Sequence, residues 1–349
     1  MLDPSTGFPV MNHERDDETT STGLADLLPQ VDIAGAARCL AGVVRRTPLI
    51  PFDCSNPALE LRLKAEHLQE TGSFKARGAW NQISKLTPET AAAGVVCTSS
   101  GNHGRALSWA AQRACVGATV FMPQDAYPNK IAACREAGAQ VVLCPTREEC
   151  EERCARAVAE GAQLIHPYDA QRTLEGAGTV GLEIAEDWPE VDVVIVPVGG
   201  GGLISGTSLA LKRALGDSVK VVGAEPAGAP SLALGMETGK PVILTDITTA
   251  IQGLCPLHSG QINIDICSRT VDLMRLVEDD AILAAQARLV AAGEKVEPAG
   301  AAAAALVFSE RLPREWLAER SQAEPLRVAV VISGGNADPE QLAALGGQV

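Results

Sequence analysis

Short apolar runs alternate with helical patterns along the middle of the chain, and this alternation restricts the fold more than any other feature. The first three runs are 95–99, 118–122 and 141–143. A helical pattern follows each of them, and a run at 191–198 continues the alternation in the second half. Strands that alternate with helices form βαβ units, whose strands pair in parallel. We therefore predict an α/β fold built on parallel strands.

Size and composition agree with this prediction. The chain has 349 residues, of which aromatic residues are only 3%. Packing must then rely on Ala, Val, Leu and Ile, which suits a parallel sheet covered by helices. Single cores seldom grow beyond about 250–300 residues, so we expect two lobes.

Two loops that contain glycine each join an apolar run to a helical pattern. Residues 99–104 read Ser-Ser-Gly-Asn-His-Gly, and residues 199–202 are four consecutive glycines. Glycine lets backbone N–H groups close around an anion at a helix N-terminus, where the helix dipole also favours negative charge. The two loops therefore predict two anion sites.

The second loop also fits a dinucleotide-binding fold, with Glu225 at about the distance of a ribose-binding acid. Four consecutive glycines do not keep the G-x-G-x-x-G spacing, so they favour a single phosphate instead. A nicotinamide-dependent oxidoreductase stays a remote alternative.

Lys75 lies within Thr-Gly-Ser-Phe-Lys-Ala-Arg-Gly-Ala, residues 71–79, just ahead of a helical pattern. A partly desolvated lysine has a lowered pKa, which makes its neutral amine available for a Schiff base with an aldehyde. A surface lysine at a helix start is the alternative. Beside two anion sites, the chemical interpretation gains weight and suggests a phosphorylated aldehyde cofactor and a carboxylate substrate.

Four motifs occur in a fixed order: Gly-Ser-Phe-Lys-x-Arg-Gly-Ala, Ser-Ser-Gly-Asn-His-Gly, the four glycines and Ser333-Gly-Gly-Asn336. In these motifs the chain resembles the pyridoxal-phosphate enzymes of fold type II, which are tryptophan synthase β-like. Within them it is most similar to the serine/threonine dehydratase and serine racemase group, over roughly residues 25–345. The resemblance implies two parallel-sheet lobes, the smaller inserted in the larger. The expected division is a disordered leader at 1–24, a large cofactor-binding domain at 25–89 and 166–349, and a small domain at 90–165.

The resemblance assigns pyridoxal 5′-phosphate to the site. Lys75 would carry the cofactor, Phe74 would line its ring, and Asn102 would bind its phenolic oxygen. Its phosphate would be held by Gly199, Gly200, Gly201 and Gly202. Ser333 would face the pyridine nitrogen, where a hydroxyl cannot hold a proton as a carboxylate would. The ring is then a weaker electron sink, which favours departure of a β-substituent over transamination.

The resemblance also places a substrate carboxylate against the first loop. The residues concerned are Ser99, Ser100, Gly101, Asn102 and His103. Serine racemases carry a serine at Ser100 as acid and base opposite the lysine, while many threonine dehydratases carry alanine. Two plainer roles stay open, an N-cap for Asn102 and a structurally satisfied side chain for His103.

A divalent cation, Mg or Mn, is a further expectation from the resemblance. Its ligands would be Glu225 and the carbonyl of Ala229. Ser231 stands where the racemase pattern has an acid, which weakens such an oxygen-ligand site.

The net charge, the lengths of the apolar runs and the cysteine content restrict the partners and the location expected for the protein. The net charge of −14 and a pI near 4.9 argue against nucleic acid and anionic membrane. No apolar run reaches about 18 residues, so no membrane span is expected. Ten scattered cysteines without a signal peptide indicate reduced thiols in the cytoplasm. The resemblance adds a homodimer.

The leading functional prediction is a dehydratase, or ammonia-lyase, that converts a β-hydroxy-α-amino acid to a 2-oxo acid and ammonia. Lys75 and Ser100 are the candidate catalytic residues. The alternative is an amino-acid racemase of the serine type, which would use both as opposed bases, whereas the dehydratase would survive loss of Ser100. Serine or threonine is the default substrate, and a hydroxyaspartate or a β-aryl serine fits the same chemistry. Residues 250–257 depart from the Ala-Asp-Gly pattern common in the group, so the substrate side chain is left open.

Overall fold

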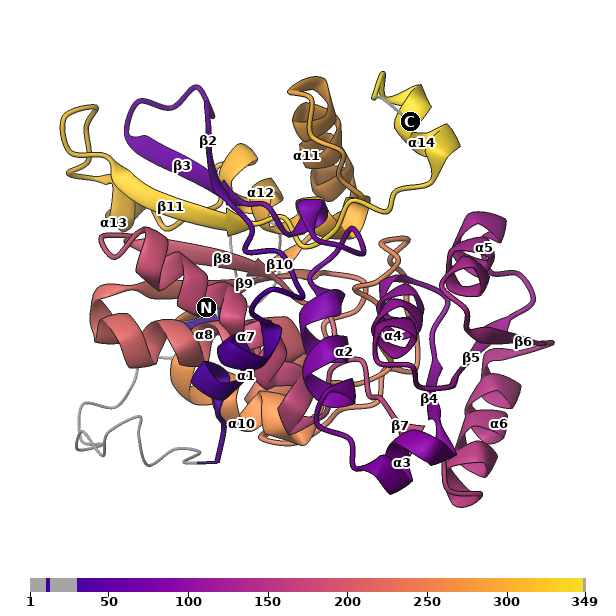
Figure 1. Ribbon diagram of the computed structural model, residues 1–349. Coiled ribbons are helices and arrows are strands. Elements are labelled where there is room, and N and C mark those ends of the chain that lie inside the picture. Colours follow the sequence, from indigo (N-terminus) through magenta and orange to yellow (C-terminus); the bar gives the residue numbers. More distant parts are fainter. Residues whose placement is uncertain (1–10, 13–29, 348–349) are drawn as a thin grey trace.

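Two β-sheets organise residues 11–12 and 30–347, which this computed structural model describes (Figure 1). The large sheet has seven strands in the order β1 (Met11–Asn12), β10 (Leu273–Val277), β9 (Lys220–Pro226), β8 (Val193–Pro197), β11 (Leu326–Val331), β3 (Leu59–Lys64) and β2 (Leu49–Phe52). The small sheet has four strands in the order β6 (Gln140–Cys144), β5 (Ala118–Pro123), β4 (Val95–Thr98) and β7 (Gln163–Leu164). Pairing is parallel except where β1 meets β10 and β2 meets β3, at the two edges of the large sheet. The predicted fold class is confirmed.

Helices connect the strands and cover both faces of the large sheet (Figure 1). The first seven are α1 (Ile33–Leu40), α2 (Lys75–Ile83), α3 (Pro88–Ala93), α4 (Asn102–Arg113), α5 (Pro128–Glu136), α6 (Arg147–Ala159) and α7 (Gln171–Asp187). The others are α8 (Gly202–Leu215), α9 (Ser231–Thr238), α10 (Gln261–Thr270), α11 (Asp279–Ala291), α12 (Pro298–Phe308), α13 (Arg314–Leu317) and α14 (Pro339–Ala344). Two short 3₁₀ turns lie at Glu66–Leu68 and Gly216–Ser218.

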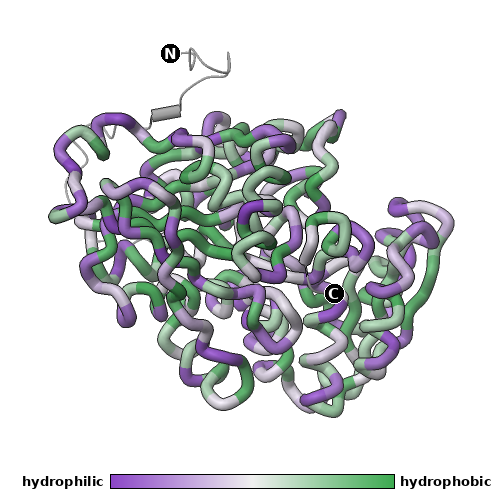
Figure 2. The backbone as a smooth tube through the Cα atoms, turned by 90° about the horizontal axis from the view of Figure 1, so that it is seen from above, coloured by the Kyte–Doolittle hydropathy of each residue, from purple (hydrophilic) through white to green (hydrophobic). Residues whose placement is uncertain are grey.

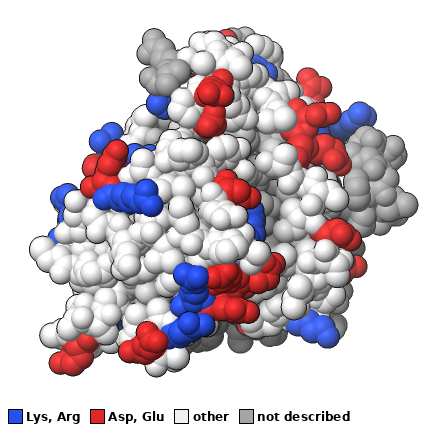
Figure 3. Space-filling model, turned by 90° about the vertical axis from the view of Figure 1, so that its right-hand side faces the viewer, with Lys and Arg blue, Asp and Glu red and all other residues white. Residues whose placement is uncertain are grey.

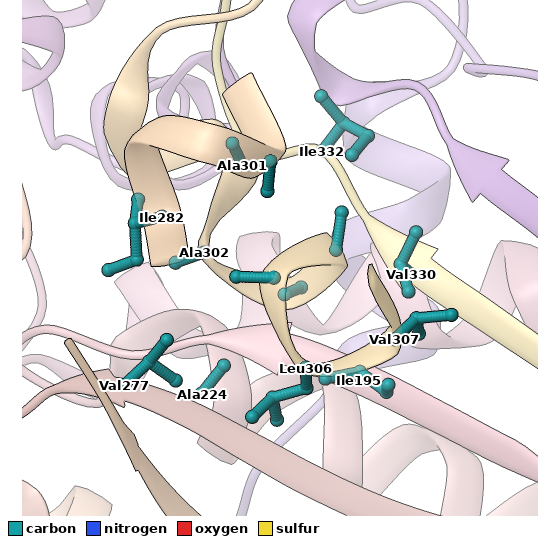
Figure 4. Packing of buried hydrophobic residues seen from close by; sticks show 14 of the residues in the cluster. Ile195, Ala224, Val277, Ile282, Ala301, Ala302, Leu306, Val307, Val330 and Ile332 are labelled. Atoms are coloured by element: carbon teal, nitrogen blue, oxygen red, sulfur yellow. The ribbon is translucent and has the colours of Figure 1, made fainter. Parts of the chain in front are cut away.

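The core on one face of the large sheet is built around α12. Residues 299–307 of this helix are all buried, as expected for a helix that is apolar on every side. Figure 4 shows Leu306 and Val307 against Ile195 and Val330 of the sheet. Green hydrophobic segments in Figure 2 accordingly gather inside the molecule.

The opposite face is covered by α7 and α8, which approach each other closely. A Cβ on Gly206 would lie 2.2 Å from the carbonyl oxygen of Leu174, and one on Gly176 would lie 2.5 Å from that of Arg77. Glycine therefore allows α2, α7 and α8 to pack backbone to backbone. This contact fixes the start of α2, where Lys75 lies.

Helix α2 also joins the core of the small sheet. Its residues Ala79 and Ile83 pack in one cluster with Val95 and Cys97 of β4 and with Leu107 of α4. Strands β4 to β7 all fall between 95 and 164, which agrees with the domain boundaries expected at 90 and 165. Those boundaries stay a prediction, because α2 contributes to the packing of both lobes.

The expected leader lies mostly outside the described residues. Of 1–24, only Met11–Asn12 is described, and it pairs with β10. Within the described residues, no helix combines the length and apolar character that a membrane crossing requires. On the face in Figure 3, acidic and basic side chains lie intermixed among uncharged surface.

Candidate active site

A cavity of about 570 Å³ lies where loops from the carboxyl ends of strands in both sheets meet. In open α/β sheets, ligands bind at such crevices. Nine of the predicted site residues line it together: Phe74, Lys75, Ser99, Ser100, Gly101, Asn102, His103, Gly200 and Ser333. Four predicted residues, Gly199, Gly201, Gly202 and the metal candidate Glu225, are not part of its lining, and neither is Ala229.

Lys75 is the first residue of α2 and faces this cavity. Its Nζ donates a hydrogen bond to the carbonyl of Pro167 at 2.7 Å and lies 4.8 Å from the ring centroid of Phe74. No carboxylate is paired with it among the described residues, and burial lowers the pKa of the amine to about 8. A substantial neutral fraction near neutral pH suits attack on an aldehyde.

Ser333 is held beside Lys75 by backbone contacts. The N–H of Phe74 donates to the carbonyl of Ser333 at 3.1 Å, and Ser73 forms a β-bridge with Gly334. Ser333 follows β11 and is only 5% exposed. The last of the four motifs is therefore brought against the first.

Asn102 is fixed from both ends of its amide group. Its Nδ2 donates to Oε1 of Glu297 at 2.5 Å, and its Oδ1 accepts from Nδ2 of Asn336 at 2.7 Å. Arg105 in turn donates to Oδ1 of Asn336 at 2.6 Å. This series of hydrogen bonds orients the amide group and leaves the second N–H of Asn102 available for a ligand.

The plainer role considered for Asn102 is wrong, because Gly101 occupies the N-cap position of α4. The side chain of Ser99 takes over the capping. Its Oγ accepts hydrogen bonds from the N–H groups of Gly101 at 3.2 Å and Gly104 at 3.1 Å.

His103 is a buried, neutral histidine. Its Nε2 lies 2.7 Å from the carbonyl oxygen of Ile165, which requires the proton on that nitrogen. Burial and the nearby Lys75 amine lower the pKa of the imidazole to about 3. Its ring is thus satisfied by the protein backbone, and a role at the substrate carboxylate stays a prediction.

In the glycine loop, side chains donate hydrogen bonds to backbone carbonyl groups, and the backbone N–H groups stay available for a ligand. Asn263 donates to the carbonyl of Gly200 at 2.9 Å, and Ser205 donates to that of Gly201 at 2.8 Å. Gly201 adopts a φ of +93°, which strongly favours glycine, and α8 begins immediately after it. The loop and helix dipole fit a phosphate group.

Replacing Gly200 with alanine should weaken cofactor binding about tenfold or more. The new Cβ would lie within 2.3–2.5 Å of ring atoms of Tyr168, so the loop must shift and misplace its N–H donors. Titration of the cofactor-free protein with pyridoxal phosphate, followed by absorbance, measures the effect. Gly117→Ala is the matched control, because no heavy atom lies within 4 Å of its added Cβ. Equal affinities of the two variants would contradict the prediction.

The candidate metal residues lie before α9, with Glu225 in β9 and Ala229 in the turn between β9 and α9. Glu225 accepts hydrogen bonds from the N–H groups of Leu232 at 2.8 Å and Ala233 at 3.0 Å, and the Ala229 carbonyl accepts from Ser231 at 2.9 Å. Burial raises the pKa of the Glu225 carboxyl to about 8. No group of three or more His, Cys, Asp or Glu suited to a metal occurs in the described part of the chain. The divalent cation stays a prediction.

Sequence reasoning missed several residues of this site. Glu297 bonds Asn102, Asn263 holds the glycine loop, and Tyr168 packs its ring on Gly200. Asn336 was recognised only as part of the fourth motif, and it orients Asn102 by a hydrogen bond to its Oδ1. Only Glu297 carries a local signal, as an acid directly before an entirely apolar helix.

Fold and site together, with a partly buried lysine and a glycine loop at one helix start, are those of an enzyme that uses a phosphorylated aldehyde. Residues 40–334 match the family described as pyridoxal-phosphate dependent enzyme, and the chain belongs to this family. Its cofactor is therefore pyridoxal phosphate, and the donor set of the glycine loop fits that group. This membership removes the nicotinamide alternative.

Similar proteins fall into two functional groups. The chain is 38% identical to the L-threonine ammonia-lyase of Thermotoga maritima, over 88% of this chain and 75% of that protein. It is 36% identical to the phenylserine dehydratase of Ralstonia pickettii, over 88% of this chain and 92% of that protein. The structure of maize serine racemase matches with a TM-score of 0.81 and 33% identity, over 89% of this chain and 94% of that one.

Proposed function

We propose that the protein is a dehydratase, or ammonia-lyase, which converts a β-hydroxy-α-amino acid to a 2-oxo acid and ammonia. The observation that carries this proposal is Ser333, whose hydroxyl lines the same cavity as the partly buried Lys75 amine, in a position where a carboxylate would favour transamination. Relatives named threonine ammonia-lyase and phenylserine dehydratase support it. Bound pyridoxal phosphate supplies an electron sink that makes the substrate's α-proton acidic.

The residues of the chain then have separate tasks. Lys75 takes the α-proton with its neutral Nζ, which lies on the cavity wall. Backbone N–H groups of Ser100, Asn102 and His103 bind the substrate carboxylate at the start of α4, because those of Ser99 and Gly101 already donate to Phe121 and to Ser99 Oγ. The N–H groups of the glycine loop hold the phosphate, and Asn102 presents its free N–H to the phenolic oxygen.

The substrate side chain points to the wall made by residues 252–256, which line the cavity. This is the segment whose sequence departs from the group pattern. The wall includes Leu254, Cys255 and Pro256, which offer apolar surface to a substituent on the β-carbon.

Assays of the purified protein with L-threonine, L-serine and L-threo-phenylserine test the proposal. We expect a visible absorbance band that shifts on addition of substrate, together with 2-oxo acid from at least one of the three. A shift without 2-oxo acid from any of them would overturn the proposal.

Racemisation is the second candidate, because Ser100 lines the same cavity and relatives include serine racemases. Replacing Ser100 with alanine should leave dehydration within about threefold of wild type and abolish any racemisation, because only racemisation needs a base on the second face. Chiral chromatography of the remaining substrate, with 2-oxo acid measured in parallel, checks both rates. Loss of dehydration by 100-fold or more would make Ser100 part of the lyase reaction.

A cytoplasmic homodimer completes this proposal, and its support is the resemblance to the dehydratase and racemase group. Light scattering on the eluting protein measures the mass in solution. A mass near the 36.3 kDa of one chain would contradict the dimer.

A further inference from the structure

Two carboxyl groups line the cavity, and they differ in exposure. Asp125 lies at the exposed rim, whereas Glu297 is only 7% exposed. Glu297 occupies the N-cap position of α12, yet its side chain does not cap that helix. The carboxyl instead turns toward Asn102 and the cavity.

The position of this carboxyl is built into the fold. A Cβ on Gly334 would lie 2.2 Å from Oε1 of Glu297, so only glycine leaves room for it. The backbone N–H of Glu297 also donates to the carbonyl of Gly334 at 3.2 Å. The carboxyl is thus tied to the segment that carries Ser333.

The carboxyl group has one oxygen free. Its Oε1 accepts from Asn102, and no other hydrogen bond or ion pair involves this carboxyl within residues 30–347. Its Oε2 is not among the buried atoms without a partner, so it is open to the cavity. A buried carboxyl without a cation is stable when it is protonated, and the protonated form can donate a hydrogen bond. The structure therefore leaves on the cavity wall a carboxyl oxygen that can carry a proton.

The surrounding charges do not reverse this conclusion. Burial raises the pKa of Glu297, while Asn102, Lys130 of α5 and Arg105 of α4 act in the opposite direction and are outweighed. Lys130 is directed toward Gln252, at 3.4 Å, and Arg105 toward Asn336. Both cations thus have other partners.

A second cavity, of about 600 Å³, also reaches Glu297. Its walls are the start of α5, residues 250 and 252, and the segment from Asn336 to Gln341. Tyr127, Lys130 and Gln252 line both cavities as well, so Glu297 lies where two adjoining cavities meet.

We propose that Glu297 binds the β-hydroxyl group of the substrate and protonates it as it leaves. This inference rests on the proposed dehydratase function. Lys75 Nζ removes the α-proton, the Cβ–O bond breaks with its electron pair on oxygen, and the Glu297 O–H proton converts that oxygen to water. The organic product is an enamine that hydrolyses to the 2-oxo acid and ammonia. Glu297 regains a proton from solvent and Lys75 returns one, so the cycle closes without an oxidant or a reductant.

A change of leaving group tests this role. Chloride departs without a proton, so β-chloro-L-alanine needs Lys75 and no acid. Replacing Glu297 with glutamine, which still accepts from Asn102, should lower 2-oxo acid formation from the hydroxy substrate by about 10²–10⁴-fold. Elimination from β-chloro-L-alanine should stay within about threefold of wild type. Exchange of the substrate α-proton in D₂O, followed by NMR, should also persist.

Matched measurements separate chemistry from structure. Glu294→Gln is the control variant, because Glu294 precedes Glu297 on the same connection but contacts His67 at 2.7 Å and is absent from the cavity lining. The cofactor absorbance band and the melting temperature show whether each variant is intact. If the Glu297→Gln variant is unstable, Glu297→Asp takes its place in the test. It keeps a carboxyl group and should therefore retain part of the rate.

The pH profile supplies a readout on the wild-type enzyme. Turnover of the hydroxy substrate should fall as the pH rises and Glu297 loses its proton, whereas turnover of β-chloro-L-alanine should not show that fall. Equal loss of both reactions in Glu297→Gln would assign a structural role and overturn the inference. Unchanged dehydration would overturn it as well. Wild-type enzyme that forms 2-oxo acid only from β-chloro-L-alanine would instead show that the proposed function is wrong.

Discussion

Replacing Lys75 with alanine should abolish turnover and the absorbance band of the bound cofactor together. The Nζ of Lys75 is the amine on the cavity wall with a pKa lowered to about 8. In the mechanism proposed above, the same atom anchors the cofactor and moves the α-proton. Loss of a positioned general base alone costs about 10²–10⁴ in rate, so the combined loss should reach at least about 10³.

The measurement is 2-oxo acid formation with an absorbance spectrum of each sample. Lys240→Ala is the control, because that lysine is exposed and lies outside the cavity lining. Lys75→Ala protein with wild-type turnover would remove the lysine from the mechanism. A control variant that also loses the band would point to loss of folding instead.

Replacing Arg77 with leucine should destabilise the fold by about 3–5 kcal/mol, because it breaks a buried ion network and leaves charge unpaired. Arg77 is fully buried and donates to Glu66 at 2.7 and 2.8 Å and to Glu183 at 2.6 Å. Lys64 also donates to Glu183, at 2.6 Å. Glu183 therefore keeps a partner in the variant, while Glu66 loses its cation.

The titration of Glu66 predicts in which direction this stability contribution changes with pH. Burial raises the pKa of Glu66, but the Arg77 guanidinium outweighs it and holds the pKa below its usual range. The pair thus stabilises the fold above the unfolded-state pKa of a carboxyl, and the contribution is lost as the pH falls through the folded-state pKa. Leucine at position 77 should remove that acid dependence.

Thermal unfolding measures the loss, which we expect to be about 5–10 °C. Arg46→Leu is the control, since that arginine contacts Glu186 and Asp187 with half of its side chain exposed, and exposed pairs contribute about 0–1 kcal/mol. Equal melting temperatures for the two variants would show that the buried network carries no more stability than a surface pair.

The network also bears on the site, because Arg77 lies on α2 two residues after Lys75. Its partners come from the turn before α2 and from α7, so it ties the start of α2 to the large lobe. Variants that weaken it should therefore loosen the position of Lys75. In the sequence, Arg77 was recognised only as one position of the Gly-Ser-Phe-Lys-x-Arg-Gly-Ala motif.

Sequence patterns were sufficient to predict the fold class, the cofactor chemistry and the nine residues that line one cavity. Alternating strands and helices, a lysine in a compact setting and runs of glycine are local features, because backbone sterics and hydrogen bonding act between near neighbours. The motif order added the resemblance to a family, and residues 40–334 match that family. Local patterns therefore reached as far as the residues that line this cavity.

The side chains that support those residues, and the burial of each, could be recognised only in the three-dimensional structure. Asn336 and Glu297 are distant from Asn102 in the chain, and their hydrogen bonds exist because β11 and α12 bring them to the start of α4. Burial has the same origin: the neutral His103 ring and the proton-donating Glu297 carboxyl follow from the desolvation that the packed lobes impose. A pKa depends on the whole surroundings of a group in space, and no local pattern encodes those surroundings.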